Sequence, residues 1–186
     1  FPTRRSSDLH LMNIRVIVPC YNEGEVVLKT YDKLTEIMKK DSLIKNYEYD
    51  LLFINDGSTD TTIHHIKNIV AYDNHVKYLS FSRNFGKEAA MIAGYQHSTM
   101  HDAVIMIDGD LQHPPEYIPQ MIEGYIEGYD QVVAKRNRQG ENFVRKTLSR
   151  CYYKLINAFV EDIQFEDGVG DFRLLSRRAV DRKSTR

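Results

Sequence analysis

Short apolar runs alternate with amphipathic stretches along most of the chain. The runs that have the length and the β-branched content of buried strands are residues 14–19, 49–55, 76–81, 103–107 and 131–134. The stretches between them that have apolar residues near helical spacing are residues 25–40, 61–70, 87–98 and 114–127. Strands that alternate with helices at short spacing predict a mainly parallel sheet with right-handed crossovers, so the predicted fold class is α/β.

This alternation ends after Ala134. Residues 135–154 carry seven basic residues against one acidic, whereas residues 161–171 carry five acidic residues and no basic ones. Residues 143–160 predict a further helix with one apolar face. Its basic side chains suit either solvent or an anionic membrane surface, and the pattern leaves both interpretations open.

The composition is that of a folded protein, because 42% of the 186 residues are hydrophobic and 27% are charged. The net charge of −1 gives no general attraction to nucleic acid, so nucleic acid is not expected as a partner. No run approaches 18 consecutive apolar residues, so we expect the chain as given to be soluble. Cys20 and Cys151 lie in apolar patterns and are expected to be buried free thiols in a reducing compartment.

The two ends of the chain are polar and carry no apolar pattern. Residues 1–9 have no apolar segment of the kind that a signal peptide requires. We interpret residues 1–9 and 182–186 as non-native tails, and residues 10–181 as one domain.

Polar clusters follow three of the predicted strands. They are residues 19–23 (PCYNE), 55–58 (NDGS) and 108–112 (DGDLQ). Ligands of an open parallel sheet bind beyond the carboxyl ends of the strands, so the three clusters together predict one composite site. Asp108 and Asp110 offer hard oxygen ligands to Mg²⁺ or Mn²⁺. Dinucleotide dehydrogenases and P-loop enzymes are excluded, because neither glycine-rich signature occurs.

Five segments in register carry a resemblance to a known family. They are residues 18–25 (VPCYNEGE), 54–61 (INDGSTDT), 83–94 (RNFGKEAAMIAG), 108–115 (DGDLQHPP) and 170–176 (GDFRLLS). In these segments the chain resembles the family 2 glycosyltransferases of the GT-A fold. It is most similar to the polyisoprenyl-phosphate branch, which includes bactoprenol glucosyltransferases and dolichol-phosphate mannose synthases. Gly109 departs from the family, which more often has alanine there, and Asn55 replaces an aspartate of many relatives.

The resemblance implies a Rossmann-like GT-A catalytic domain over residues 10–181. It implies inverting, metal-dependent transfer of a sugar from a nucleotide-sugar, with UDP favoured over GDP, to a polyisoprenyl phosphate. The implied ligands of the Mg²⁺ or Mn²⁺ ion are Asp108, Asp110 and Gln112. The implied nucleotide-sugar residues are Pro19, Tyr21, Glu23, Asp56, Asp108, Lys87 and Arg136, of which Lys87 and Arg136 would neutralise the diphosphate.

The implied catalytic residues are Asp171 and Arg173. Arg173 would hold the acceptor phosphate, and Asp171 would orient the acceptor or act as a base. A lipid monophosphate is mostly dianionic at neutral pH, so it needs cationic positioning more than a base. The alternatives are an enzyme that extends a hydroxyl of a polysaccharide or glycolipid, and a non-catalytic nucleotide-sugar-binding module.

Members of this branch usually continue into amphipathic helices and transmembrane spans. The resemblance therefore implies a C-terminally truncated domain of a longer enzyme at the cytoplasmic face of a membrane, which the missing C-terminal region would contact. The identity of the sugar and the formation of homo-oligomers are left open.

Overall fold

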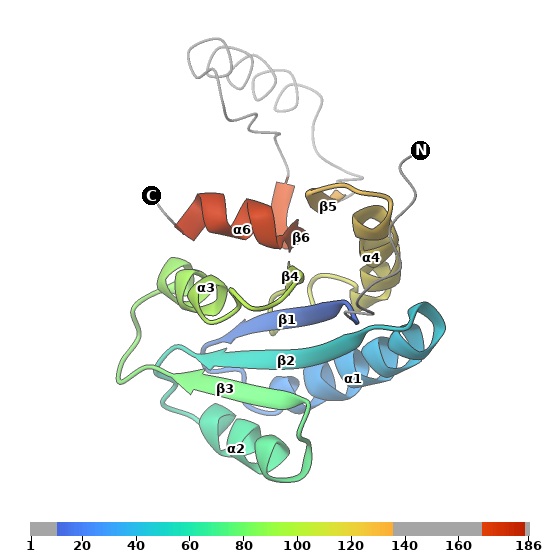
Figure 1. Ribbon diagram of the computed structural model, residues 1–186. Coiled ribbons are helices and arrows are strands. Elements are labelled where there is room, and N and C mark those ends of the chain that lie inside the picture. Colours follow the sequence, from blue (N-terminus) through green and yellow to red (C-terminus); the bar gives the residue numbers. More distant parts are fainter. Residues whose placement is uncertain (1–10, 136–168, 185–186) are drawn as a thin grey trace, which may run out of the picture.

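The computed structural model describes residues 11–135 and 169–184, which form one sheet with helices on both faces (Figure 1). The strands are β1 (Asn13–Cys20), β2 (Glu48–Asn55), β3 (Val76–Ser80), β4 (Ala103–Met106), β5 (Gln131–Lys135) and β6 (Val169–Ser176). The helices are α1 (Val26–Lys45), α2 (Thr62–Tyr72), α3 (Lys87–Gln96), the short 3-10 helix η1 (Pro115–Tyr117), α4 (Ile118–Ile126) and α6 (Arg177–Ser184).

The strand order is β3-β2-β1-β4-β6-β5. Strand β1 runs parallel to β2 and β4, and β2 runs parallel to β3. Strand β6 is antiparallel to both of its neighbours, β4 and β5. The predicted α/β class with a mainly parallel sheet is therefore confirmed.

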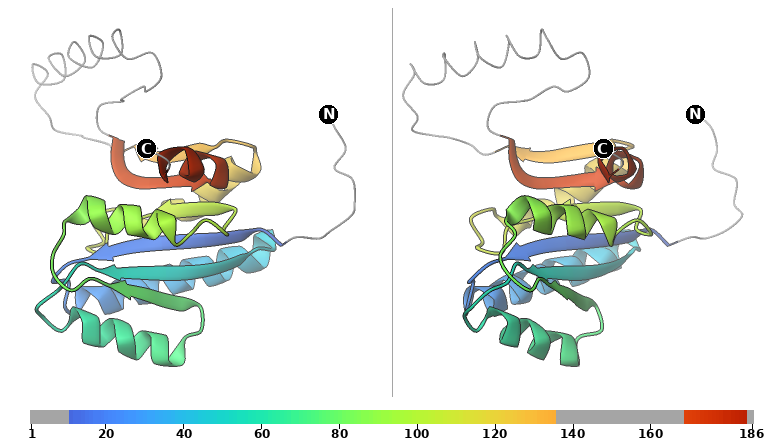
Figure 2. Two further views of the ribbon diagram at one scale, coloured as in Figure 1. Left: turned by 60° about the vertical axis from the view of Figure 1, so that its left-hand side comes forward. Right: turned by 90° about the vertical axis from the view of Figure 1, so that its left-hand side faces the viewer.

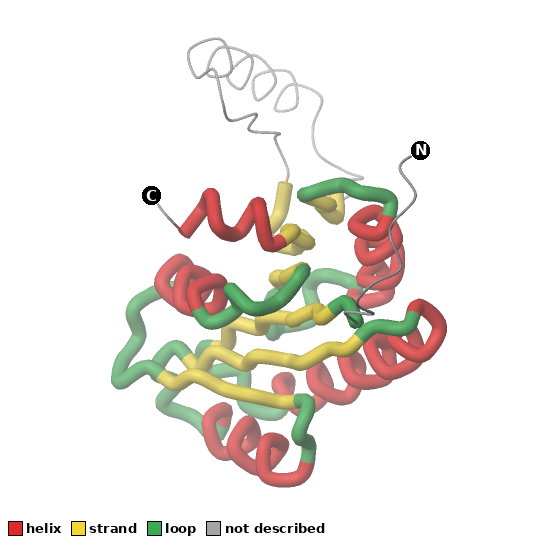
Figure 3. Tube along the Cα trace, viewed as in Figure 1, coloured by secondary structure: helices red, strands yellow, loops and turns green. Residues whose placement is uncertain are grey.

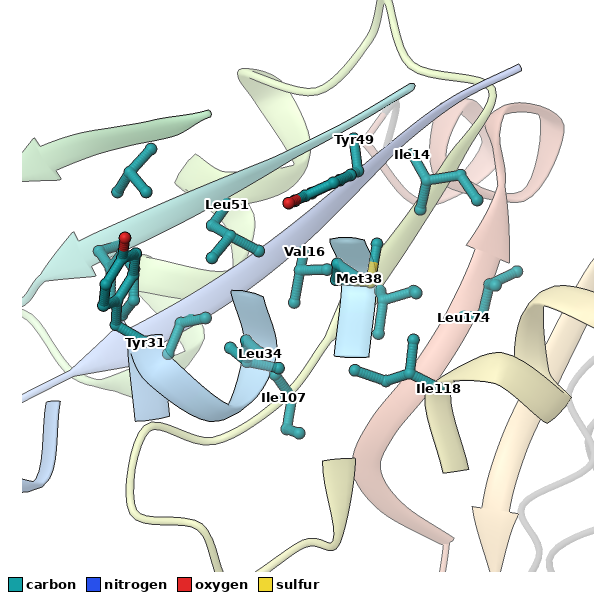
Figure 4. Close-up of a cluster of buried hydrophobic side chains, with 14 of the residues drawn as sticks. Ile14, Val16, Tyr31, Leu34, Met38, Tyr49, Leu51, Ile107, Ile118 and Leu174 are labelled. Atoms are coloured by element: carbon teal, nitrogen blue, oxygen red, sulfur yellow. The ribbon is translucent and has the colours of Figure 1, made fainter. Parts of the chain in front are cut away.

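Alternate residues of the strands face opposite sides, so the sheet supports two apolar cores. Helices α1, α2 and α4 pack on one core and α3 and α6 on the other; Figure 2 shows α1 and α3 on opposite faces. On the first face, Leu34 and Met38 of α1 lie against Val16 of β1 (Figure 4). On the second face, α3 lies close to the sheet because a Cβ on Gly94 would be only 2.6 Å from the Cγ2 of Ile17.

The strand order reverses between β1 and β4. The chain builds outward from β1 to β3, and α3 then returns across the opposite face to β4. Strands β1 and β2 end together, because Cys20 pairs with Asn55. Figure 3 shows the loops that leave the sheet at this edge. Such a reversal leaves a crevice beyond the strand ends, where ligands of open α/β sheets bind.

Two described elements were not predicted. Strand β6 (VGDFRLLS) interrupts its apolar positions with glycine, aspartate and arginine, although Phe172, Leu174 and Leu175 are all buried. Helix α6 (RRAVDRKS) is so polar that its sequence lacks an apolar stripe. It includes residues 182–184, but the assignment of tails and domain bounds stays a prediction.

Cys20 is buried and free, as predicted. Cys151, the predicted helix at residues 143–160 and the basic stretch lie outside the described residues, apart from Lys135 at the end of β5. In the described ranges, no helix combines the length and apolar character that crossing a bilayer requires.

Candidate functional site

A cavity of about 270 Å³ lies where β1, β2 and β4 end and α3 begins. It is lined by Pro19, Cys20, Tyr21, Glu23, Asp56, Asn84, Gly86, Lys87, Ala90, Asp108, Gly109 and Asp110. All three polar clusters that follow the predicted strands contribute to it. The convergence expected from a parallel sheet is therefore present in the structure.

The loop after β1 is held by the residues that lead into α2. The amides of Glu23 and Gly24 donate to Thr62 Oγ1 at 2.8 and 2.9 Å, and the Gly24 amide also donates to Asp60 Oδ2 at 3.0 Å. Asp60 Oδ1 in turn accepts the Thr62 amide at 3.0 Å, so Asp60 supports both the start of α2 and this loop. These bonds fix the backbone from which Glu23 reaches the cavity.

Asp56 fixes the loop before α3. Its Oδ1 accepts the amide of Phe85 at 2.7 Å, and its Oδ2 accepts the amide of Gly86 at 2.9 Å. The two loops touch at Gly57, which has a φ of 64°, and a Cβ there would lie 2.2 Å from the carbonyl carbon of Arg83. Asp56 thus shapes the cavity wall before any ligand binds. Only the remaining lone pairs of its carboxylate could accept a hydrogen bond from the nucleobase of a bound nucleotide.

The loop after β4 is anchored from α1 and by its own turn. Thr30 Oγ1 donates to the Gly109 carbonyl at 2.6 Å, and the backbone amide of Gln112 donates to Asp110 Oδ1 at 3.0 Å. Leu111 has a φ of 58°, a left-handed conformation that costs energy for a residue with a side chain. A Cβ on Gly109 would lie 3.0 Å from the Sγ of Cys20, so the absence of a side chain at Gly109 lets the loop pack closely against Cys20.

Negative charge accumulates at this end of the sheet. Burial, followed by the charges of Asp110, Asp108 and Asp60, raises the pKa of Glu23 above its ordinary value. Burial and the charges of Glu23 and Asp108 likewise raise the pKa of the Cys20 thiol, which keeps it protonated and unreactive. Such a cluster of carboxylates favours the binding of cations.

Asp108 lies between two nitrogen-bearing side chains. Its Oδ1 is 2.6 Å from the Nζ of Lys87, and its Oδ2 is 3.5 Å from the Nδ1 of His113. The His113 ring also contacts the ring of Phe172 in β6, with 5.7 Å between the ring centroids. His113 therefore links the Asp108 loop to the strand that carries the GDFR segment.

The sequence pattern does not single out His113. It lies within the segment DGDLQHPP, but nothing in that pattern separates it from its neighbours. Asn84 and Gly86 were also not proposed as site residues, although both line the cavity. Their position depends on the contact between the Asp56 loop and the loop before α3, which sequence spacing does not reveal.

Seven of the predicted site residues line the cavity together: Pro19, Tyr21, Glu23, Asp56, Lys87, Asp108 and Asp110. The Gln112 side chain is exposed and is not among the lining residues, so its role as a metal ligand stays a prediction. Arg136 lies outside the described residues, and its predicted contact with the diphosphate also stays a prediction.

The GDFR segment lies in β6 beside β4. Arg173 is half-buried and is opposite Met106 of β4 and Val133 of β5. Because β6 is antiparallel to β4, the residues before Arg173 extend toward the edge at which Asp108 follows β4. The backbone of Asp171 lies in this part of β6, while its side chain lies outside what the structure describes.

Within the described ranges, no group of three or more His, Cys, Asp or Glu side chains is placed to enclose a metal ion. Asp108 and Asp110 nevertheless fit Mg²⁺ or Mn²⁺, because both line the cavity and supply carboxylate oxygens. Mg²⁺ in particular usually takes one or two protein carboxylates and completes its coordination shell with water and substrate phosphates.

Comparison with known proteins identifies the family of this domain. The family model described as glycosyl transferase family 2 matches residues 15–183. The chain belongs to glycosyl transferase family 2. This confirms the resemblance inferred from the five segments.

The relatives of this family 2 domain include proteins of bacteria and phages. The chain is 53% identical over 167 residues to CsbB of Bacillus subtilis (strain 168), which is named as a glycosyltransferase; the match covers 90% of the chain and 49% of CsbB. It is 43% identical over 171 residues to the bactoprenol glucosyl transferase of Shigella phage SfX, with 91% and 54% covered. The chain thus spans about half the length of the curated relatives it matches.

Solved structures of glycosyltransferases share the fold. The mannosyltransferase PcManGT from Pyrobaculum calidifontis, in complex with GDP-Man and Mn²⁺, has a TM-score of 0.63 at 16% identity, covering 94% of this chain and 47% of PcManGT. Glucosyl-3-phosphoglycerate synthase from Mycobacterium tuberculosis, in complex with UDP, has a TM-score of 0.58 at 22% identity, covering 90% and 57%. The family 2 domain therefore has the GT-A fold.

Proposed function

We propose that this domain transfers a sugar, with inversion, from a nucleotide-sugar to a polyisoprenyl phosphate. The observation that carries the proposal is the cavity that brings Asp56, Lys87, Asp108 and Asp110 together at the reversal of the strand order. The identity of 43% to a bactoprenol glucosyl transferase supports a polyisoprenyl lipid as the acceptor.

On the donor side, Pro19 and Tyr21 provide apolar and aromatic surface for the nucleoside, and Lys87 provides positive charge for the diphosphate. Arg136 would add a second cation. Asp108 and Asp110 would hold the divalent metal ion, which is Mn²⁺ in the PcManGT complex. When bound, the ion stabilises the negative charge of the departing nucleoside diphosphate.

On the acceptor side, the proposal assigns the lipid phosphate to Arg173 and Asp171 of β6. The phosphate oxygen forms a bond to the anomeric carbon as the bond from that carbon to the diphosphate breaks. The nucleoside diphosphate leaves with the electron pair of the broken bond. No proton has to be removed, because a phosphate monoester is mostly dianionic at neutral pH. Arg173 would then act by positioning the acceptor.

We further propose that the enzyme works at a membrane, because its acceptor is a lipid, and the cytoplasmic face stays a prediction. A hydroxyl acceptor of a polysaccharide or glycolipid would instead require a base to take up its proton. The segment Gly170-Asp171 supports the phosphate, because enzymes with hydroxyl acceptors often carry Glu-Asp there.

The test is transfer of labelled sugar from a panel of UDP- and GDP-sugars to undecaprenyl phosphate in detergent, with Mn²⁺ or with EDTA. We expect lipid-linked label only with the metal ion, and a fall of about 100-fold in rate for Asp110→Asn. Asp32→Asn, an exposed carboxylate on α1, is the matched control and keeps the wild-type rate.

Other outcomes of this assay point to the alternatives. Transfer to a carbohydrate hydroxyl but not to the lipid phosphate would identify an enzyme that extends glycans. Binding of a nucleotide-sugar with turnover on neither acceptor would favour a non-catalytic binding module. Equal rates with Mn²⁺ and with EDTA would contradict the proposed role of Asp108 and Asp110.

A further inference from the structure

The Asp108 carboxylate, which would bind the metal ion, is already paired with an ammonium group of this chain. The Nζ of Lys87 lies 2.6 Å from Asp108 Oδ1. The two residues come from different elements, since Lys87 begins α3 and Asp108 follows β4. The start of α3 is held in place by the bond from the Gly86 amide to Asp56 at 2.9 Å. The fold itself therefore presents Lys87 to Asp108.

We propose that Lys87 is a placeholder cation that couples binding of the metal ion to binding of the nucleoside diphosphate. The inference rests on the proposed function and adds to it the order and cooperativity of ligand binding. Without ligands, the ammonium neutralises Asp108. When the diphosphate enters, the ammonium moves to the phosphate oxygens and leaves Asp108 to the metal ion.

Electrostatic competition gives this coupling its sign. An ammonium and a divalent cation on one carboxylate repel each other, so the metal ion alone must displace Lys87 from Asp108. The diphosphate offers Lys87 new anionic oxygens, so the metal ion displaces it from Asp108 at a lower electrostatic cost. Each ligand consequently raises the affinity for the other, by the same factor in both directions.

The chemistry and the exposure of Lys87 suit a group that moves between two partners. A lysine has a flexible stem and a compact charge, whereas an arginine fork is tied to one planar geometry. The Lys87 side chain is 40% exposed and that of Asp108 is 20% exposed. An ion pair that is this open to solvent contributes little to folding, so its loss is expected to leave the fold intact.

The experiment is a titration with Mn²⁺, followed by the electron paramagnetic resonance signal of free Mn²⁺. It is done with and without UDP and is corrected for Mn²⁺ that UDP itself binds. We expect UDP to raise the Mn²⁺ affinity of the wild type at least about tenfold. Lys87→Met should bind Mn²⁺ alone about tenfold more tightly than the wild type, bind UDP more weakly, and retain less than about threefold coupling.

Two variants serve as controls. Lys87→Arg keeps a cation at Asp108 and should bind Mn²⁺ alone as weakly as the wild type. Lys67→Met removes the same charge from an exposed position on α2 and should change neither affinity. Equal thermal unfolding midpoints of Lys87→Met and the wild type exclude an indirect effect through the fold.

The inference fails if Lys87→Met binds Mn²⁺ alone no more tightly than the wild type, or if its coupling to UDP is unchanged. Either result leaves the proposed function intact, provided that the wild type binds both Mn²⁺ and UDP. If the wild type fails to bind Mn²⁺ both in the presence of UDP and in the presence of GDP, the proposed function itself is contradicted.

Discussion

Asp56 shows how one buried side chain can both define a cavity and line it. It follows β2, is only 4% exposed, and uses both carboxylate oxygens to accept the amides of Phe85 and Gly86. Those amides lie 29 and 30 residues away in sequence. The family resemblance predicts Asp56 in the nucleotide pocket, but this separation in sequence gives no sign of its contact with the loop before α3.

Asp56→Asn tests this structural role. The amide nitrogen of asparagine cannot accept a hydrogen bond, so one backbone N–H loses its partner in a buried position. We expect the free energy of unfolding to fall by about 1–3 kcal/mol and the affinity for UDP to fall with it. Urea denaturation and calorimetric titration measure the two effects, with Asp32→Asn as the exposed control. A variant with weakened UDP binding but unchanged stability would contradict the structural role.

At the scale of the elements, a buried ion-pair network joins three neighbouring strands. Arg15 of β1 donates from Nε to Asp50 Oδ1 of β2 at 2.6 Å and from Nη2 to Oδ2 at 2.5 Å. Lys77 of β3 reaches Oδ2 at 2.9 Å, and the Nε2 of His101, just before β4, lies 3.3 Å from it. Arg15, Asp50 and His101 are all buried, so the network depends on each of these three partners, whereas the Lys77 side chain is 57% exposed.

The network makes stability depend on pH. Burial alone would raise the pKa of Asp50, but the hydrogen bonds from Arg15, His101 and Lys77 and the charge of Arg15 hold it well below its usual range. The unfolded chain therefore binds a proton at a higher pH than the folded one. The contribution of Asp50 is present above the ordinary aspartate pKa of about 3.9 and is lost as the pH falls below that value.

Asp50→Asn should lower the free energy of unfolding at pH 7 by about 3–5 kcal/mol, because it leaves the Arg15 charge buried and unpaired. Between about pH 4 and pH 2 the wild type should lose stability more steeply than the variant. Urea unfolding at a series of pH values measures both effects. Parallel pH profiles for the two proteins would show that Asp50 is not the group responsible.

The elements also show what a sequence pattern can predict. Strands β1, β2 and β4 were predicted because their apolar runs are buried on both faces of a parallel sheet. Once they are parallel, the polar residues after each strand must share one edge, so most of the site follows from topology. The pattern could not predict β6, because its glycine, aspartate and arginine interrupt the apolar positions, and its burial depends on the two cores that form on the faces of the assembled sheet. Nor could it predict the pairing of Lys87 with Asp108, which depends on where α3 begins.

At the scale of the whole molecule, the cavity and the two cores are built on one sheet but depend on different residues. The cavity gathers loops from several elements at one edge, whereas the cores hold the helices on the two faces. Ligands that bind only the folded chain therefore stabilise every element of the sheet together. A substitution in a core should consequently lower the unfolding midpoint but keep its rise with ligands. A substitution of a ligand-binding residue in the cavity should keep the midpoint but reduce that rise.

Thermal unfolding with and without Mn²⁺ and UDP distinguishes the stability of the cores from ligand binding in the cavity. At 100 times the dissociation constant, ligands add about 2.7 kcal/mol, which corresponds to a rise of about 5 °C or more in the midpoint for a domain of this size. Leu34→Ala, in the core under α1, should lower the midpoint without ligands but keep this rise, since Leu34 is fully buried away from the cavity. Asp110→Asn should keep the midpoint and lose the part of the rise that requires Mn²⁺. If Leu34→Ala abolished the rise while Asp110→Asn retained it, the metal ion and nucleotide would have to bind elsewhere than the carboxyl ends of β1, β2 and β4.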